Sequence, residues 1–120
     1  FLTVNASVAP TREEAEALLL PNLQSMARLR TGQPLRPLDL VEDAQGARVT
    51  PQEQHIIDAV AAKTVLGEPA EAAEQLRSLA ARFAVDEVMV HPVAAARRGT
   101  DPATAPAREQ TLELLAKELF

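Results

Sequence analysis

The segment from Val65 to Val90, VLGEPAEAAEQLRSLAARFAVDEVMV, constrains the fold of this chain more than any other. It predicts a Gly-Pro turn, an amphipathic helix and then a strand, the helix-to-strand step of a parallel α/β protein. The apolar side of the predicted helix consists of Leu76, Leu79, Ala80 and Phe83. The strand, Val88–Val90, is apolar at every position, as strands covered on both faces of a parallel sheet are. A chain of 120 residues leaves little material to cover both faces.

A second predicted strand lies at the start of the chain. Residues 2–8, LTVNASV, alternate between apolar side chains and small polar ones, which is the period of a strand. Two interpretations remain open for the polar face. It is either solvated, or it belongs to a barrel strand whose Asn5 and Ser7 line a ligand cavity.

Four further segments follow from local signals. Thr11 and Glu14 fit a capping box at a helix start, and Pro21 predicts a break or a kink in the helix that follows. Residues 31–49 contain two glycines and two prolines without a period, which predicts a long loop. Thr50-Pro51-Gln52-Glu53 predicts another capped helix. A last helix over 106–119 is predicted from the spacing of Leu112, Leu115, Ala116 and Leu119.

Composition excludes several classes of protein. The net charge of −5 argues against general nucleic-acid binding, which needs a basic face. No cysteine is present for a disulfide or a thiolate metal site, and two histidines do not suggest a metal cluster. The apolar runs are far shorter than the roughly 20 residues of a membrane helix. We therefore expect a soluble, cytoplasmic protein, and its start at Phe1 and thin aliphatic core suggest a piece of a larger one.

The ordered set of segments resembles the C-terminal part of bacterial luciferase-like flavin-dependent monooxygenases. The stretches that carry this resemblance are Leu2–Val8, Thr11–Ala15, Arg28–Pro34, Thr50–Glu53, Val65–Pro69 and Val85–Val90. The sequence departs from the family at Glu68, where the family usually has Ser or Thr, and at His91-Pro92, where it commonly has Thr-Thr.

The resemblance implies a fold and a cofactor. The fold would be the C-terminal fragment of a TIM (β/α)8 barrel, helix-rich, with two parallel strands as the seventh and eighth of the barrel. Residues 1–120 would then comprise strand 2–8, insertion loop 31–49, helix–strand unit 68–90 and last helix 106–119. Intact family members use reduced FMN and O2 to oxidise a small organic substrate, and a related possibility is a flavin or deazaflavin reductase. Because most flavin-phosphate contacts come from earlier strands, this fragment should be inactive and should not bind FMN alone.

Six residues are candidates for the substrate or flavin side of a site. His91 stands at the C-terminal end of the last strand, which faces the active site in a TIM barrel, although a loop-packing histidine is the plainer interpretation. Asn5 and Ser7 would point into the barrel if Leu2 and Val4 pack outward. Arginines suit bidentate phosphate contact, but they also suit a solvated loop edge. The arginines concerned are Arg28, Arg30 and Arg36.

No catalytic residue and no metal ligand is predicted, and His55 is assigned no role. An alternative function from another class is a small helix-rich interaction module that pairs through an exposed strand edge. Strands without neighbours on both sides invite pairing with another chain, so a homo-oligomer is expected from either hypothesis.

Overall fold

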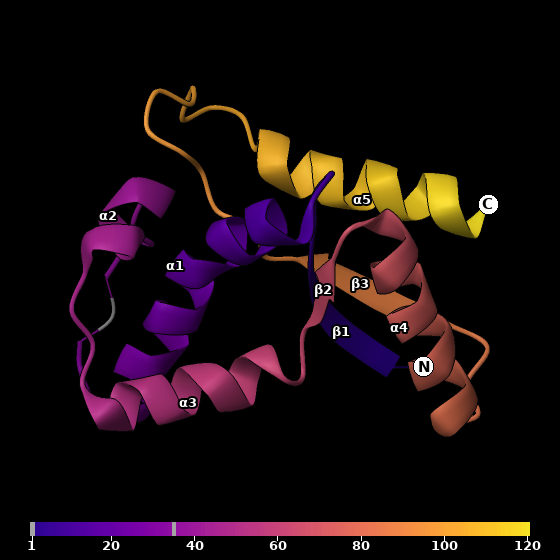
Figure 1. The fold of residues 1–120 in the computed structure, drawn as a ribbon, viewed down its shortest axis with the longest axis horizontal. Coiled ribbons are helices and arrows are strands. Elements are labelled where there is room, and N and C mark those ends of the chain that lie inside the picture. Colours follow the sequence, from indigo (N-terminus) through magenta and orange to yellow (C-terminus); the bar gives the residue numbers. More distant parts are fainter. Residues whose placement is uncertain (1, 35) are drawn as a thin grey trace.

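A three-stranded parallel sheet forms the centre of the computed structural model, which describes residues 2–34 and 36–120. In Figure 1, α1, α2 and α3 form the left half of the molecule, and the strands with α4 and α5 form the right half. The elements in chain order are β1 (Leu2–Val8), α1 (Arg12–Arg30), α2 (Val41–Gly46), α3 (Pro51–Ala61), β2 (Val65–Gly67), α4 (Pro69–Arg82), β3 (Val88–Pro92) and α5 (Pro106–Leu119). The α/β class predicted from the sequence is confirmed.

The strand order is β2-β1-β3, with β1 in the middle and parallel to both neighbours. The predicted parallel neighbours at the two ends of the chain are therefore present as β1 and β3. The prediction of two strands is wrong by one, because Val65–Gly67 pairs with β1 instead of forming only a turn. Successive strands of a (β/α)8 barrel lie in sequence order, so this order does not confirm a barrel fragment.

The two faces of the sheet are covered differently. On one face, Val4, Ala6 and Val8 of β1 pack against Leu76 of α4 and Leu115 of α5 in one apolar cluster. A second cluster joins α1, α3, Leu66 and the segment after β3. The second cluster covers the opposite face only near the carboxyl ends of the strands, so part of that face remains open.

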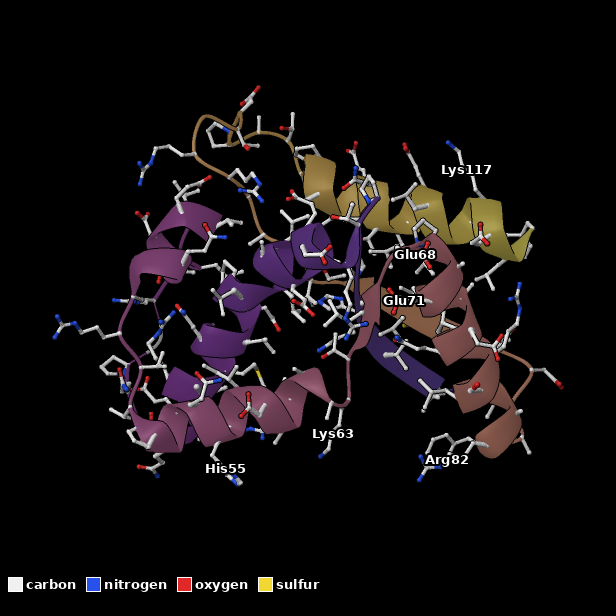
Figure 2. All side chains as sticks on the ribbon, viewed as in Figure 1. His55, Lys63, Glu68, Glu71, Arg82 and Lys117 are labelled. Carbon is white, nitrogen blue, oxygen red and sulfur yellow. The ribbon has the colours of Figure 1, made fainter. Side chains whose placement is uncertain are left out.

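Local signals explain where three helices begin. Thr50 forms the predicted capping box with Glu53, and α3 begins at Pro51. Glu68, although glutamate is a less common N-cap than Ser, Thr or Asp, forms a reciprocal capping box with Glu71 at the start of α4, where Figure 2 shows the two side chains together. The Thr11 hydroxyl accepts from the Glu14 N–H at the start of α1, but the Glu14 side chain does not reach back. The full capping box predicted there is therefore wrong.

Two predictions of irregular structure are corrected by the fold. Helix α1 continues through Pro21, which is fully buried, so the predicted break is absent and the predicted kink stays a prediction; packing of the helix compensates for the one backbone bond that proline removes. The segment predicted as a loop over residues 31–49 contains α2, whose Val41 and Ala44 are buried. Burial of these two side chains gives this short helix a reason to form without a clear sequence period.

Three residues assigned to apolar helix faces are exposed. Phe83, the residue after α4, is 53% exposed, Leu112 on α5 is 45% exposed, and Ala116 on α5 is exposed as well. One of the two buried residues of α5 is Thr111, whose hydroxyl accepts from the Val8 N–H at 3.1 Å and lies 3.3 Å from the Val8 carbonyl oxygen. A polar residue is buried here because the β1–β3 ladder ends at Ala6 and Pro92, which leaves the Val8 backbone groups in need of a partner.

The outer edge of β2 is closed by a side chain. The Gln75 amide accepts from the Leu66 N–H at 2.9 Å and donates to the Leu66 carbonyl at 2.8 Å. These are the two bonds that a neighbouring strand would otherwise make. Gln75 therefore protects this edge from pairing with another chain.

We predict that Gln75→Ala lowers the free energy of unfolding by about 1–3 kcal/mol, because two half-buried backbone groups lose their partner. The measurement is thermal or urea unfolding followed by circular dichroism. Ser78→Ala, an exposed position on the same helix, is the matched control and should leave stability nearly unchanged. Equal stability of the Gln75→Ala variant and the wild-type chain would contradict the edge-closing role.

Candidate functional site

The open part of the sheet face carries the small polar side chains of β1. Since Val4, Ala6 and Val8 face α4 and α5, strand alternation places Thr3 and Asn5 on the opposite face. On β3, Val88 and Val90 pack toward the same helices, so Met89 and His91 lie on the open face as well. We call these four residues, Thr3, Asn5, Met89 and His91, the open-face residues.

The strand register brings two of the predicted site residues together. Asn5 and His91 are Cα partners in the β1–β3 ladder, and Thr3 and Met89 are partners one step before them. Neighbouring strands lie about 4.8 Å apart, so the amide and the imidazole project side by side from one surface. His91 is exposed and Asn5 is half-buried, so both can offer hydrogen-bond donors and acceptors to a bound molecule.

Ser7 shares this face but is not accessible on it. Its side chain is fully buried, and its hydroxyl donates to the Ala15 carbonyl at 2.8 Å. This bond fixes the first turn of α1 against the carboxyl end of β1. Ser7 therefore has a structural role that the alternation of residues along the strand did not predict.

The three predicted arginines lie at the far end of α1. Arg28 and Arg36 flank the Asp39 carboxylate at N–O distances of 3.7 and 3.2 Å, and Arg30 is exposed nearby in the sequence. A helix of 19 residues is about 28 Å long, and its first turn is the end that contacts the sheet. The arginines are therefore not part of the Asn5–His91 surface. His55, given no role, projects outward from α3 in Figure 2.

Arg97, in the segment after β3, is a functional candidate that the sequence analysis missed. Its guanidinium donates twice to the Glu14 carboxylate, at 3.1 and 2.6 Å, and lies 3.6 Å from Glu42 of α2. Next to it, the Arg98 N–H donates to Glu42 at 2.7 Å. The signal available in the sequence was the Arg97-Arg98 pair that follows a strand. The acidic partners of this pair lie far away in the chain, because Glu14 is 83 residues before Arg97 and Glu42 is 56 residues before Arg98.

These contacts change the electrostatics of both partners. The hydrogen bond from the Arg98 backbone N–H holds the pKa of the Glu42 carboxyl below its ordinary value, and the nearby guanidinium charges act in the same direction. The hydrogen bond to Glu14 raises the pKa of Arg97 further above its ordinary value. The cluster thus holds α2 against the start of α1.

Two other features are absent from the described ranges 2–34 and 36–120. No group of three or more metal-ligating side chains is gathered there. No helix in these ranges has the length and apolar character needed to cross a membrane.

Comparison with known proteins gives a likeness in fold. No known protein family and no curated protein matches the chain. Among solved structures, it is similar to the crystal structure of apo-MsnO8, with a TM-score of 0.74 and 22% sequence identity. The likeness covers 98% of this chain but 33% of that chain, so this chain spans about a third of the length of MsnO8. At this identity the likeness shows the fold alone.

We predict that the contact between α2 and Arg98 weakens at acidic pH. The folded-state pKa of Glu42 is depressed, so its stabilising contribution is complete above the ordinary value of 4.5 and is lost as the pH falls through the folded-state pKa. Hydrogen exchange of the α2 amides, corrected for intrinsic rates, should therefore accelerate over this range.

Glu42→Gln is the matching variant and should show fast α2 exchange with little of this pH dependence. Glu113→Gln, at an exposed position on α5, is the control and should behave as the wild type. Protection of α2 that stays constant as the pH falls would contradict the role of Glu42.

Proposed function

We propose that this chain is part of a luciferase-like flavin-dependent oxidoreductase, whose open-face residues contribute one wall of the substrate or flavin pocket. The observation that carries the proposal is the sheet with one face covered by helices and the other open, with Asn5 and His91 side by side. Its support is the likeness in fold to a third of MsnO8, a luciferase-like monooxygenase. The ordered sequence segments favour the same family.

The arrangement suits the ring or substrate side of such a pocket and not the phosphate side. Arg28 and Arg36 are already engaged with Asp39, at the end of α1 away from the sheet. The open-face residues offer an amide, an imidazole and an apolar thioether, which can orient a planar or organic molecule by hydrogen bonds and contact. Reduced FMN with O2 would supply the oxidation chemistry in the intact protein, and its phosphate would be held by residues outside this chain.

Helix α2, which lies within the predicted insertion loop, has a second role in this proposal. It is tied to the start of α1 because Arg97 contacts both Glu14 and Glu42. Long segments at the rim of a pocket commonly act as lids that limit access of water. A segment held by exposed ion pairs, which are individually weak, can be released and closed again at small cost.

The test is FMN titration of the longer protein encoded by the same gene and of the isolated 120-residue chain. We expect the longer protein to quench flavin fluorescence and the isolated chain not to. Within the longer protein, Asn5→Ala or His91→Ala should weaken substrate or flavin binding by about 1 kcal/mol each, or roughly fivefold, through a lost hydrogen bond.

His55→Ala, on the outer side of α3, is the matched control and should leave binding unchanged. A gene that encodes little beyond these residues would contradict the proposal. So would a longer protein that does not bind FMN, or one in which the Asn5 and His91 variants bind and turn over like the wild type.

Closure of a barrel has a structural consequence that can be tested separately. In a barrel, β1 and β3 would be the adjacent seventh and eighth strands, so the β1–β3 pairs of this chain would be kept. Cysteines placed together at Thr3 and Met89, which are Cα partners here, should therefore form a disulfide both in the isolated chain and in the longer protein. A disulfide that forms in the isolated chain but not in the longer protein would contradict the barrel.

A further inference from the structure

A tight turn in the segment after β3 carries two adjacent arginines. The Thr100 N–H donates to the Arg97 carbonyl at 3.1 Å, which closes a four-residue β-turn over residues 97–100. Gly99, the third residue of this turn, has a φ of 89°, a value that favours glycine and that a type II turn needs at this position. The sequence Arg-Arg-Gly-Thr therefore gives Arg97 and Arg98 a defined backbone geometry.

Three donors of this turn are directed at two carboxylates of α2. The Arg98 N–H donates to Glu42 Oε1 at 2.7 Å, and Arg97 Nη1 lies 3.6 Å from Glu42 Oε2. Arg98 Nη2 donates to the Asp43 carboxylate at 2.9 Å. One backbone N–H and two guanidinium groups thus hold two negative charges that belong to a neighbouring helix.

These two carboxylates can be displaced. The side chains of Glu42, Asp43 and Arg98 are 32%, 54% and 68% exposed, and exposed ion pairs are individually weak, so an anion from solution can compete with them. Arg97 is held separately, because its guanidinium donates twice to Glu14 of α1. The basic part of the cluster therefore keeps its place when the α2 carboxylates leave.

We propose that the Arg97-Arg98 turn is a binding site for a phosphate group, and that Glu42 and Asp43 occupy it when no such ligand is bound. A phosphate monoester carries nearly two negative charges at neutral pH and has three strong acceptor oxygens. One phosphate can therefore accept from all three donors and replace the charge of both carboxylates. A carboxylate ligand would supply one charge and two oxygens.

The proposed phosphate site is separate from the pocket wall described under Proposed function, because it uses none of the open-face residues. A cavity of about 190 Å³ adjoins Arg97 and is lined in part by Glu14, Thr100 and Gln110. Pockets for drug-sized molecules have volumes of about 300–1,000 Å³, so this cavity is too small for a flavin ring system. The ligand is accordingly inorganic phosphate or a small phosphate ester, and not FMN.

The experiment uses the 120-residue chain without flavin, so its outcome is independent of flavin binding. Amide NMR at neutral pH follows a titration with sodium phosphate and a second titration with sodium chloride at equal ionic strength. Phosphate should shift the Arg98 amide signal with half-saturation on the order of 1 mM and should speed hydrogen exchange of α2. Chloride should cause only small changes that do not saturate. Tighter binding of glycerol phosphate than of inorganic phosphate would assign the site to an ester, and the reverse order would assign it to the free ion.

Two variants with matched controls test the residues themselves. Glu42→Gln removes a competing charge and should lower the half-saturating phosphate concentration about tenfold, whereas Glu118→Gln, exposed on α5, should leave it unchanged. Arg98→Gln should raise this concentration about tenfold, whereas Arg82→Gln, exposed on α4, should not. Equal effects of phosphate and chloride overturn the proposal, as does a phosphate affinity that neither Glu42→Gln nor Arg98→Gln changes. The turn would then serve only to hold α2.

Discussion

The pairing of β1 with a strand on each side is the constraint on which the rest of the structure depends. Ala6, Ser7 and Val8 near its carboxyl end are fully buried, and the elements around them attach there. Ser7 holds the first turn of α1 through the Ala15 carbonyl, and Thr111 of α5 satisfies the Val8 backbone. The small side chains Ala6 and Ser7 let helices approach the strand closely, so one short strand organises elements from both ends of the chain.

Capped helices were predictable because their signals are local. Thr50 with Pro51, and Pro69 at the start of α4, act within one turn of the backbone, and the structure has helices beginning at both prolines. The short strand β2 was not predictable in the same way. Val65–Gly67 has three residues and turn-like flanks, and its strand conformation depends on pairing with Ala6–Val8, which lie about 59 residues earlier in the sequence. Gly67, with φ of 146°, has no room for a side chain against Glu71, a requirement that the sequence alone does not explain.

The candidate site was partly predictable for the same reason. Strand alternation is local, so it correctly placed Asn5 on the face opposite Val4, and the parallel arrangement then made His91 its neighbour. The roles of Ser7, Arg28 and Arg36 depended on partners chosen by the fold. The Ala15 carbonyl accepts a hydrogen bond from the Ser7 hydroxyl, and the Asp39 carboxylate contacts both arginines. A pattern of residue types cannot distinguish a side chain that is free to bind a ligand from one that already contacts a group of its own chain.

The difference between the two sheet edges connects the fold with the proposed function. An unpaired strand edge is a liability only when another strand can pair with it. This chain closes the edge of β2 through the Gln75 amide, whereas no hydrogen bond within the described residues reaches the outward backbone groups of Val88 and Val90 on β3. A neighbouring strand of a larger barrel would satisfy these groups through a parallel ladder of hydrogen bonds. Closure into a barrel would also enclose Asn5 and His91 in a pocket, whereas a sheet that stays open keeps them on an open surface. The partner that β3 takes therefore decides whether these two side chains can work in a water-poor pocket, where their hydrogen bonds would be strongest.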